Sequence, residues 1–243
     1  MQVLVGDGCG NRFALVEGSA MKNAKLTPGL LIHQCQDLDI DGLLVLNGIK
    51  LEIFNLDGSD GGACFNGMRM AAIASGLDDG EFTMSGQNIK WQRLDDQIEL
   101  LLPYSEQDFE LAELEIDGYM VSTVSFSNPH AIVKNYDGYE QDFAERLQAD
   151  ADHFPNSVNV EFVKSPYSGE EISARIFERG VGETMACGTA AVALAIDAWS
   201  SGMTGEITVK TWGGSLFLKK SEQGKISLRG EARVTGNIDL ELA

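Results

Sequence analysis

Cysteine, histidine and basic residues are scarce in this chain of 243 residues. It has four cysteines and three histidines, and no CxxC pair, so zinc-finger spacing is absent and we expect no metal site. Lysine and arginine total 18 against 37 aspartates and glutamates, a formal net charge of −19. The acidic residues are scattered along the chain, which argues against nucleic acid or an anionic membrane as a partner.

Long apolar runs are also lacking. No stretch reaches the roughly 20 apolar residues that span a bilayer, and residues 1–17 show no basic segment followed by an apolar run, as a secretory signal would. We therefore expect a cytoplasmic protein whose cysteines are thiols. A hydrophobic content of 44% can support a core in one large domain or in two of roughly 120 residues each, and we predict two.

Two stretches half a chain apart share one pattern. Residues 60–67 read DGGACFNG and residues 183–190 read ETMACGTA. In each, an acid precedes an Ala-Cys pair, small or polar residues follow, and a helical pattern begins at once. The chain therefore consists of two related halves with one cysteine, Cys64 or Cys187, at a matching position in each. Two acid–base groups on opposite faces of one carbon are what a cofactor-free racemase or epimerase needs.

The elements around the cysteines repeat the same plan. Short strand patterns and glycine turns precede a predicted helix over residues 68–75 in the first half and 189–200 in the second, and a third helix is predicted over 142–149. Residues 103–107 form the best linker candidate. The repetition indicates two α+β domains built alike, 1–116 and 117–231, with a C-terminal strand over 232–243 that we expect to complete the first domain.

The position of each cysteine suggests its chemistry. A helix N-terminus has unpaired N–H groups and a partial positive charge, so we expect the pKa of Cys64 and Cys187 to be lowered. The same N–H groups can bind a substrate carboxylate and stabilise the enolate that forms when an α-proton leaves. Cys9 and Cys35 are interpreted as small buried hydrophobes. A redox role for the pair of Cys64 and Cys187 remains an alternative.

Four motifs resemble those of diaminopimelate epimerases. They are FNLDGS at 54–59 followed by CFNGMR at 64–69, ERGVGETMACGT at 178–189, GNRF at 10–13 and SNPH at 127–130. The resemblance implies an epimerase of two pseudo-symmetric domains, each a mixed β-sheet or barrel wrapped around a central helix. It also implies conversion of L,L-diaminopimelate to the meso form, for lysine and peptidoglycan synthesis, by a cytoplasmic homodimer that uses no cofactor.

The resemblance also assigns roles to residues. Cys64 and Cys187 exchange the roles of acid and base, and His130 and Glu178 tune their ionisation. The distal amino-acid group of the substrate is bound by Asn55, Asn128, Asn159, Glu178 and Arg179. The reacting carboxylate is held by Asn66, Gly188, Thr189 and the N–H groups around the cysteines, while Asn11 and Phe65 line the first domain's side of the site.

Two departures from the family keep other substrates open. Phe65 follows the first cysteine where the family has glycine, and Gly42 stands where the family has a glutamine. A two-cysteine racemase of another amino acid, such as histidine, is therefore an alternative. A non-catalytic binding protein or thiol redox protein on the same fold is a third hypothesis, which the presence of both cysteines with His130 and Glu178 disfavours.

Overall fold

The structure is a computed structural model that describes residues 1–126, 128–164, 167, 169, 171–222 and 224–240. The chain forms two compact units, unit 1 from Met1–Pro103 with the segment that starts at Arg229, and unit 2 from Tyr104–Leu228. Among the described residues, no helix is long and apolar enough to cross a membrane.

In chain order the elements are β1 (Gln2–Gly8), β2 (Asn11–Glu17), α1 (Gly18–Ala24), α2 (Pro28–Gln34), η1 (Gln36–Leu38), β3 (Gly42–Asn47), β4 (Lys50–Asn55), α3 (Phe65–Ser75), β5 (Asp79–Met84), β6 (Gln87–Leu94), β7 (Gln97–Ser105), η2 (Glu106–Asp108), β8 (Glu110–Ile116), β9 (Tyr119–Ser125), β10 (Pro129–Lys134), α4 (Glu140–Ala149), β11 (Asn159–Val163), β12 (Glu171–Glu178), β13 (Gly182–Thr184), α5 (Gly188–Ser200), β14 (Ile207–Thr211), β15 (Gly214–Lys220) and β16 (Lys225–Asp239).

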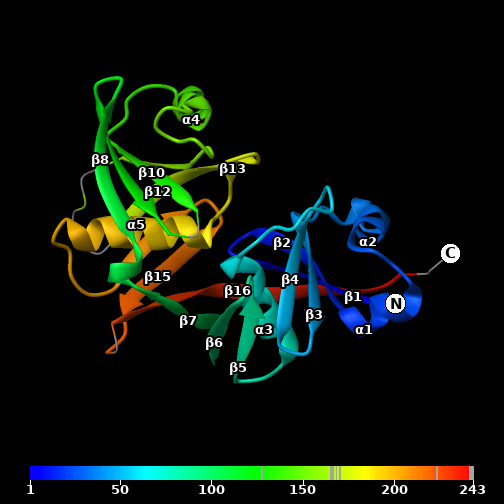
Figure 1. Cartoon of the computed structure of the whole chain (residues 1–243). Coiled ribbons are helices and arrows are strands. Elements are labelled where there is room, and N and C mark those ends of the chain that lie inside the picture. Colours follow the sequence, from blue (N-terminus) through cyan, green and yellow to red (C-terminus); the bar gives the residue numbers. More distant parts are fainter. Residues whose placement is uncertain (127, 165–166, 168, 170, 223, 241–243) are drawn as a thin grey trace. The chain divides into compact units, whose positions relative to one another are not determined.

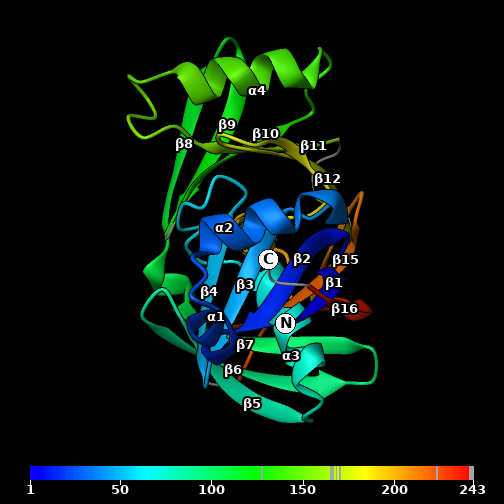
Figure 2. The same ribbon diagram turned by 90° about the vertical axis from the view of Figure 1, so that its right-hand side faces the viewer.

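Unit 1 is a sheet that closes on itself around α3. Its described strands follow the order β1-β2-β3-β4-β5-β6-β7-β16, and β1 also pairs with β16 from Gly8 opposite Ala232 to Gln2 opposite Asp239. Helix α3 contacts β1, β2, β5 and β6, and its first eight residues are all buried. Helices α1 and α2 cover the other face near β3 (Figure 2). The side chains between these two helices and the sheet form an apolar cluster.

Unit 2 has the same plan. Its strand order continues from β16 through β15-β14-β12-β11-β10-β9-β8. Helix α5 contacts β9, β10, β11, β14 and β15, and it is buried from Gly188 to Trp199. Figure 1 shows α5 beside the strands and α4 apart from it. Each unit therefore has one central helix, and that helix follows directly after a cysteine.

The two faces of the unit 2 sheet differ because side chains alternate along a strand. Ala131, Val160 and Phe162 pack with Phe143 and Leu147 of α4 in one apolar cluster. His130, Asn159 and Glu161 alternate with these residues along β10 and β11, so their side chains point to the opposite face of the sheet. The polar side chains of β10 and β11 predicted for the site, His130 and Asn159, therefore lie on the α5 face of this sheet.

All three predicted helices form. Helix α3 begins three residues before its predicted start, α4 two residues before and α5 one residue before. Helices α1 and α2 and strands β8, β10 and β13 were not predicted. The linker predicted over 103–107 is made of the end of β7, which continues to Ser105, and the start of a 3-10 turn. The units nevertheless divide at Pro103, so that 104–116 belong to unit 2. Residues 241–243 of the predicted C-terminal strand lie outside the described residues.

Candidate active site

Cys64 is the N-cap of α3, as the sequence pattern predicts. Its backbone is extended, and its sulfur accepts a hydrogen bond from the N–H of Gly67 at 3.4 Å. Asn11 of β2 is its neighbour, with 4.0 Å between Sγ and the amide oxygen, and Asn66 reaches the same oxygen at 3.5 Å. Unit 1 therefore brings together Asn11, Cys64 and Asn66, three of the residues predicted for the site.

A buried arginine fixes the orientation of Asn66. Arg69 is fully buried, and its guanidinium donates to the amide oxygen of Asn66 at 2.8 Å and to the carbonyl of Phe65 at 3.4 Å. No carboxylate is among these partners. Since an arginine stays protonated in proteins, a buried positive charge lies beside the first turn of α3, where it favours nearby negative charge.

The remaining predicted residues of unit 1 have different surroundings. Phe65 is 2% exposed, so its ring is part of the interior of unit 1 and its backbone carbonyl is held by Arg69. Asn55 is exposed after β4, and its amide donates to Ser59 at 3.0 Å within the turn. These contacts of Asn55 are those of a turn residue.

Cys187 is the N-cap of α5 and is more buried than Cys64. Its sulfur lies 3.2 Å from the hydroxyl of Thr189, and Ile176 and Ala190 pack against it. Burial raises the pKa of the Cys187 thiol well above its usual range, the charge of Glu178 raises it further, and the Thr189 hydrogen bond opposes both. The expected lowering of this pKa is therefore wrong for Cys187, because desolvation outweighs the helix N-terminus.

Glu178 lies at the end of β12, next to the loop that leads to Cys187. Its carboxylate accepts a hydrogen bond from the hydroxyl of Thr184 at 2.7 Å, and β13 holds the loop against β12, with Gly182 opposite Glu178. Thr189 and Gly188, both buried, form the first turn of α5. The second cysteine motif therefore folds into one compact group of Glu178, Cys187, Gly188 and Thr189.

His130 lies in the interior of unit 2 beside an acid that the sequence analysis did not identify. Its Nδ1 is 2.7 Å from Oε1 of Glu161, and both side chains are 0% exposed. The imidazole stacks on the ring of Phe126 with centroids 5.6 Å apart and an interplanar angle of 15°. The position of Glu161 offers a signal in the sequence, because it is an acid between the apolar residues Val160 and Phe162 of a predicted strand.

Arg179 joins two of the predicted asparagines. Its backbone N–H donates to the amide oxygen of Asn159 at 3.0 Å, and its guanidinium donates to the amide oxygen of Asn128 at 3.3 Å and to the carbonyl of Asn156 at 2.8 Å. Three members of the predicted distal group, Asn128, Asn159 and Arg179, are therefore together in unit 2. Ser127, in the same motif as Asn128, lies outside the described residues.

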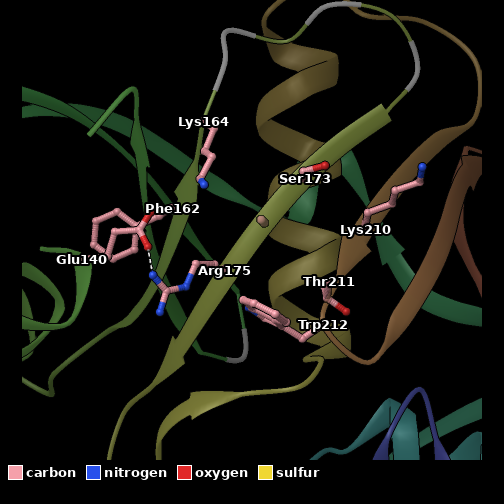
Figure 3. A pocket seen from close by; sticks show the side chains of 9 residues that line it. Glu140, Phe162, Lys164, Ser173, Arg175, Lys210, Thr211 and Trp212 are labelled. Carbon is pink, nitrogen blue, oxygen red and sulfur yellow. Dashed lines mark hydrogen bonds and ion pairs between the residues drawn. The ribbon is translucent and has the colours of Figure 1, made fainter. Parts of the chain in front are cut away.

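A pocket of about 280 Å³ opens elsewhere in unit 2, on β11, β12 and β14 (Figure 3). Arg175 reaches across it to Glu140 of α4 and also binds both carboxylate oxygens of Glu183, at 2.7 and 2.8 Å. The described residues lining it include none of those predicted for the site. The pocket is linked to the candidate site through Arg175, which binds Glu183 in the segment that leads to Cys187.

Solved structures define the fold class. The chain is similar to a PhzF-family phenazine biosynthesis protein from Bacillus anthracis, with 13% identity, a TM-score of 0.70 and 99% of both chains covered. It is similar also to a hydroxyproline epimerase from Agrobacterium vitis with bound trans-4-hydroxy-L-proline, with 12% identity, a TM-score of 0.67 and coverage of 98% of this chain and 90% of that chain. The fold predicted from the resemblance, two similar domains each around a central helix, is confirmed.

Sequence relatives then define the family. The family model described as diaminopimelate epimerase matches residues 122–235. Diaminopimelate epimerase of Pelotomaculum thermopropionicum is 32% identical, with 93% of each chain covered, and that of Geobacillus thermodenitrificans is 33% identical, with 79% of this chain and 78% of the relative covered. The chain belongs to the diaminopimelate epimerase family, as the motifs predict, and is an isomerase that acts on a small molecule.

The raised pKa of Cys187 predicts its reactivity in the protein without substrate. Only the thiolate reacts with iodoacetamide, so alkylation of Cys187 should be slow at pH 7 to 8. Its rate should still rise about tenfold per pH unit above the usual thiol pKa of about 8.5, where a free cysteine levels off. Peptide mass spectrometry after timed alkylation from pH 7 to 10 measures this rate. A plateau below pH 8.5 for the Cys187 peptide would contradict the assignment.

Proposed function

We propose that this protein converts L,L-diaminopimelate to meso-diaminopimelate, with Cys64 and Cys187 as acid and base on opposite faces of the α-carbon. The observation that carries the proposal is the matching position of the two thiols. Each is the N-cap of the buried central helix of its unit, in a chain of the diaminopimelate epimerase family. A pair of thiols at equivalent places in two similar units suits a reaction whose two faces differ only in the direction of proton transfer.

The helix N-termini supply the second requirement of the reaction. The α-proton of an amino acid is weakly acidic, and its removal needs stabilisation of the charge that develops on the carboxylate. The first turns of α3 and α5 offer backbone N–H groups that have no carbonyl partner within the helix, with the amide of Asn66 and the hydroxyl of Thr189 beside them. In the proposal these groups bind the reacting carboxylate.

The resting proton of Cys187 suggests the first step. With its pKa raised, Cys187 is a thiol and can donate its proton, while Cys64 as the thiolate removes the α-proton from the other face. The two sulfurs then hold opposite protonation states. In the reverse direction the carboxylate of Glu178 can accept the proton that Cys187 must lose, and His130 is a second group proposed to tune the ionisation of the thiols.

The substrate assignment depends on the distal group. Diaminopimelate carries a second amino-acid end, with a carboxylate and an ammonium. A guanidinium binds the carboxylate, and amide and carboxylate oxygens accept from the ammonium. Arg179, joined to Asn128 and Asn159 in unit 2, supports this assignment. The family resemblance also supports a cytoplasmic homodimer, and light scattering of the purified protein would give its mass in solution.

The first test follows the reaction in deuterium oxide. We expect the fully reduced protein to convert L,L-diaminopimelate to meso product that carries solvent deuterium at the α-carbon. Because general acid–base catalysis contributes about 10²- to 10⁴-fold, Cys64→Ala and Cys187→Ala should each lower epimerisation by at least about 100-fold. NMR measures the deuteration and chiral chromatography the product.

Cys35→Ala is the matched control, since Cys35 is fully buried in the apolar cluster of unit 1. It should retain wild-type turnover. Absence of any exchange by the reduced wild type would rule out the diaminopimelate assignment. Preferential exchange of a one-headed amino acid such as histidine would identify the alternative racemase instead.

A second test addresses the distal group. Arg179→Leu removes the guanidinium proposed to bind the distal carboxylate. A hydrogen bond to a charged group contributes about 1.5 to 3 kcal/mol, so the KM for diaminopimelate should rise by about 10- to 150-fold. Steady-state kinetics with Arg146→Leu, an exposed arginine paired with Asp117, provides the control. An unchanged KM in Arg179→Leu would exclude this role.

A further inference from the structure

The pair of His130 and Glu161 has two polar atoms without partners. Nδ1 of His130 is bonded to Oε1 of Glu161, while Nε2 of His130 and Oε2 of Glu161 have no hydrogen-bond partner among the described residues. Both side chains are fully buried. A buried polar atom without a partner is costly, so this arrangement calls for a functional explanation.

The fold places this pair on the α5 face of the sheet. Strands β10 and β11 are parallel, with His130 opposite Asn159 in register. Glu161 is two residues beyond Asn159 and therefore points to the same face. The neighbours Ala131 and Val160 point to the α4 cluster instead. The alternation of side chains along β11 therefore places Glu161 on the α5 face of the sheet, beside the imidazole of His130.

With a neutral imidazole, the proton in the short contact belongs either to Nδ1 of His130 or to Oε1 of Glu161. A Glu161 carboxylate can accept from Nδ1–H, which leaves Nε2 as a bare acceptor. A protonated Glu161 can instead donate to Nδ1, which leaves an N–H at Nε2 buried without an acceptor. Unsatisfied buried N–H groups are rarer than under-satisfied acceptors. The hydrogen-bond accounting therefore favours the first arrangement.

We propose that Glu161 is a positioning residue that keeps the proton on Nδ1 of His130, so that Nε2 is the nitrogen that accepts and returns a proton. When Nε2 takes the proton of a thiol, the products are a thiolate and an imidazolium whose charge the Glu161 carboxylate stabilises. Return of that proton restores the neutral ring and the thiol. The role in catalysis rests on the proposed function, whereas the proton arrangement can be measured without it.

Other titratable groups act on the same carboxyl. Burial raises the pKa of Glu161, His130 lowers it, and the charge of Glu178 raises it. Glu161 in turn contributes to the raised pKa of Cys187 and of Tyr167. A change at Glu161 therefore reaches Cys187 as well as His130, and the kinetic test needs a readout that is specific for the imidazole.

NMR of the imidazole nitrogens provides that readout. The chain has three histidines, His33, His130 and His153, so ¹⁵N-histidine labelling gives three ring systems, and His130→Gln identifies the one at 130. Nδ1 of His130 should carry the ring proton and Nε2 should be the nitrogen without one. A proton on Nε2, either with a bare Nδ1 or in an imidazolium, would overturn the proposal.

Kinetics of Glu161 variants test the consequence. Glu161→Leu removes the acceptor but leaves the imidazole, so kcat should fall by about 10- to 100-fold, no more than the lower end of the range for acid–base catalysis, with KM within about twofold. Glu161→Gln keeps an oxygen that can accept from Nδ1–H, so it should retain Nδ1 protonation and a higher kcat than Glu161→Leu.

Asp197→Asn is the matched control. Asp197 is a buried acid of α5 that binds Lys134 at 2.7 Å and Tyr167, and its replacement should leave the His130 nitrogen signals unchanged. A folded Glu161→Leu with wild-type kcat and unchanged nitrogen signals would overturn the positioning role. If Glu161→Leu does not fold, the wild-type and Glu161→Gln spectra still decide. A wild type inactive on diaminopimelate would refute the proposed function and leave the spectra interpretable.

Discussion

Enclosure of a helix within a sheet is the constraint on which the rest of this structure depends. Helix α5 is buried from Gly188 to Trp199, so its side chains must be small, apolar or bonded within the protein. Its backbone is satisfied internally except at the ends, where the first N–H groups have no helical partner. The N-terminus is therefore the part of an enclosed helix best able to bind an anion. A cysteine N-cap there places a thiol beside those N–H groups, and α3 repeats the arrangement.

The alternation of side chains along β10, β11 and β12 then gives the two faces of the unit 2 sheet different surroundings. On one face, Val160 and Phe162 pack against α4, and the pocket of Figure 3 opens around Arg175. On the other face lie His130 and Glu161, with Glu178 at the end of β12. The apolar face supplies packing energy, which offsets the cost of burying an acid and an imidazole on the opposite face. A shift of one residue in register would exchange the two sets.

The sequence was informative where the signal is local. The two cysteine loops, the helices that follow them and most of the strand positions follow from patterns in which all relevant residues lie within about a dozen positions. Helices α1 and α2 were missed because each has seven residues, too few for a clear helical period. Arg69 and Glu161 were missed for a different reason. Their roles depend on burial and on partners that become neighbours only through packing and strand register. Charged residues are mostly exposed to solvent in proteins, so the first expectation from the sequence is that both are solvated.

The two thiols share a backbone setting but differ in electrostatic surroundings. Cys187 is buried beside Glu178, and Glu161 adds to the rise in its pKa, so the neutral thiol is favoured. In unit 1 a buried guanidinium, Arg69, is bonded to Asn66, two residues after Cys64, and a buried cation favours negative charge in its vicinity. A two-base reaction needs one thiol and one thiolate at the start of each turnover. The two halves retain the helix that places the sulfur and differ in the charged groups beside that helix N-terminus, Glu178 in unit 2 and Arg69 in unit 1.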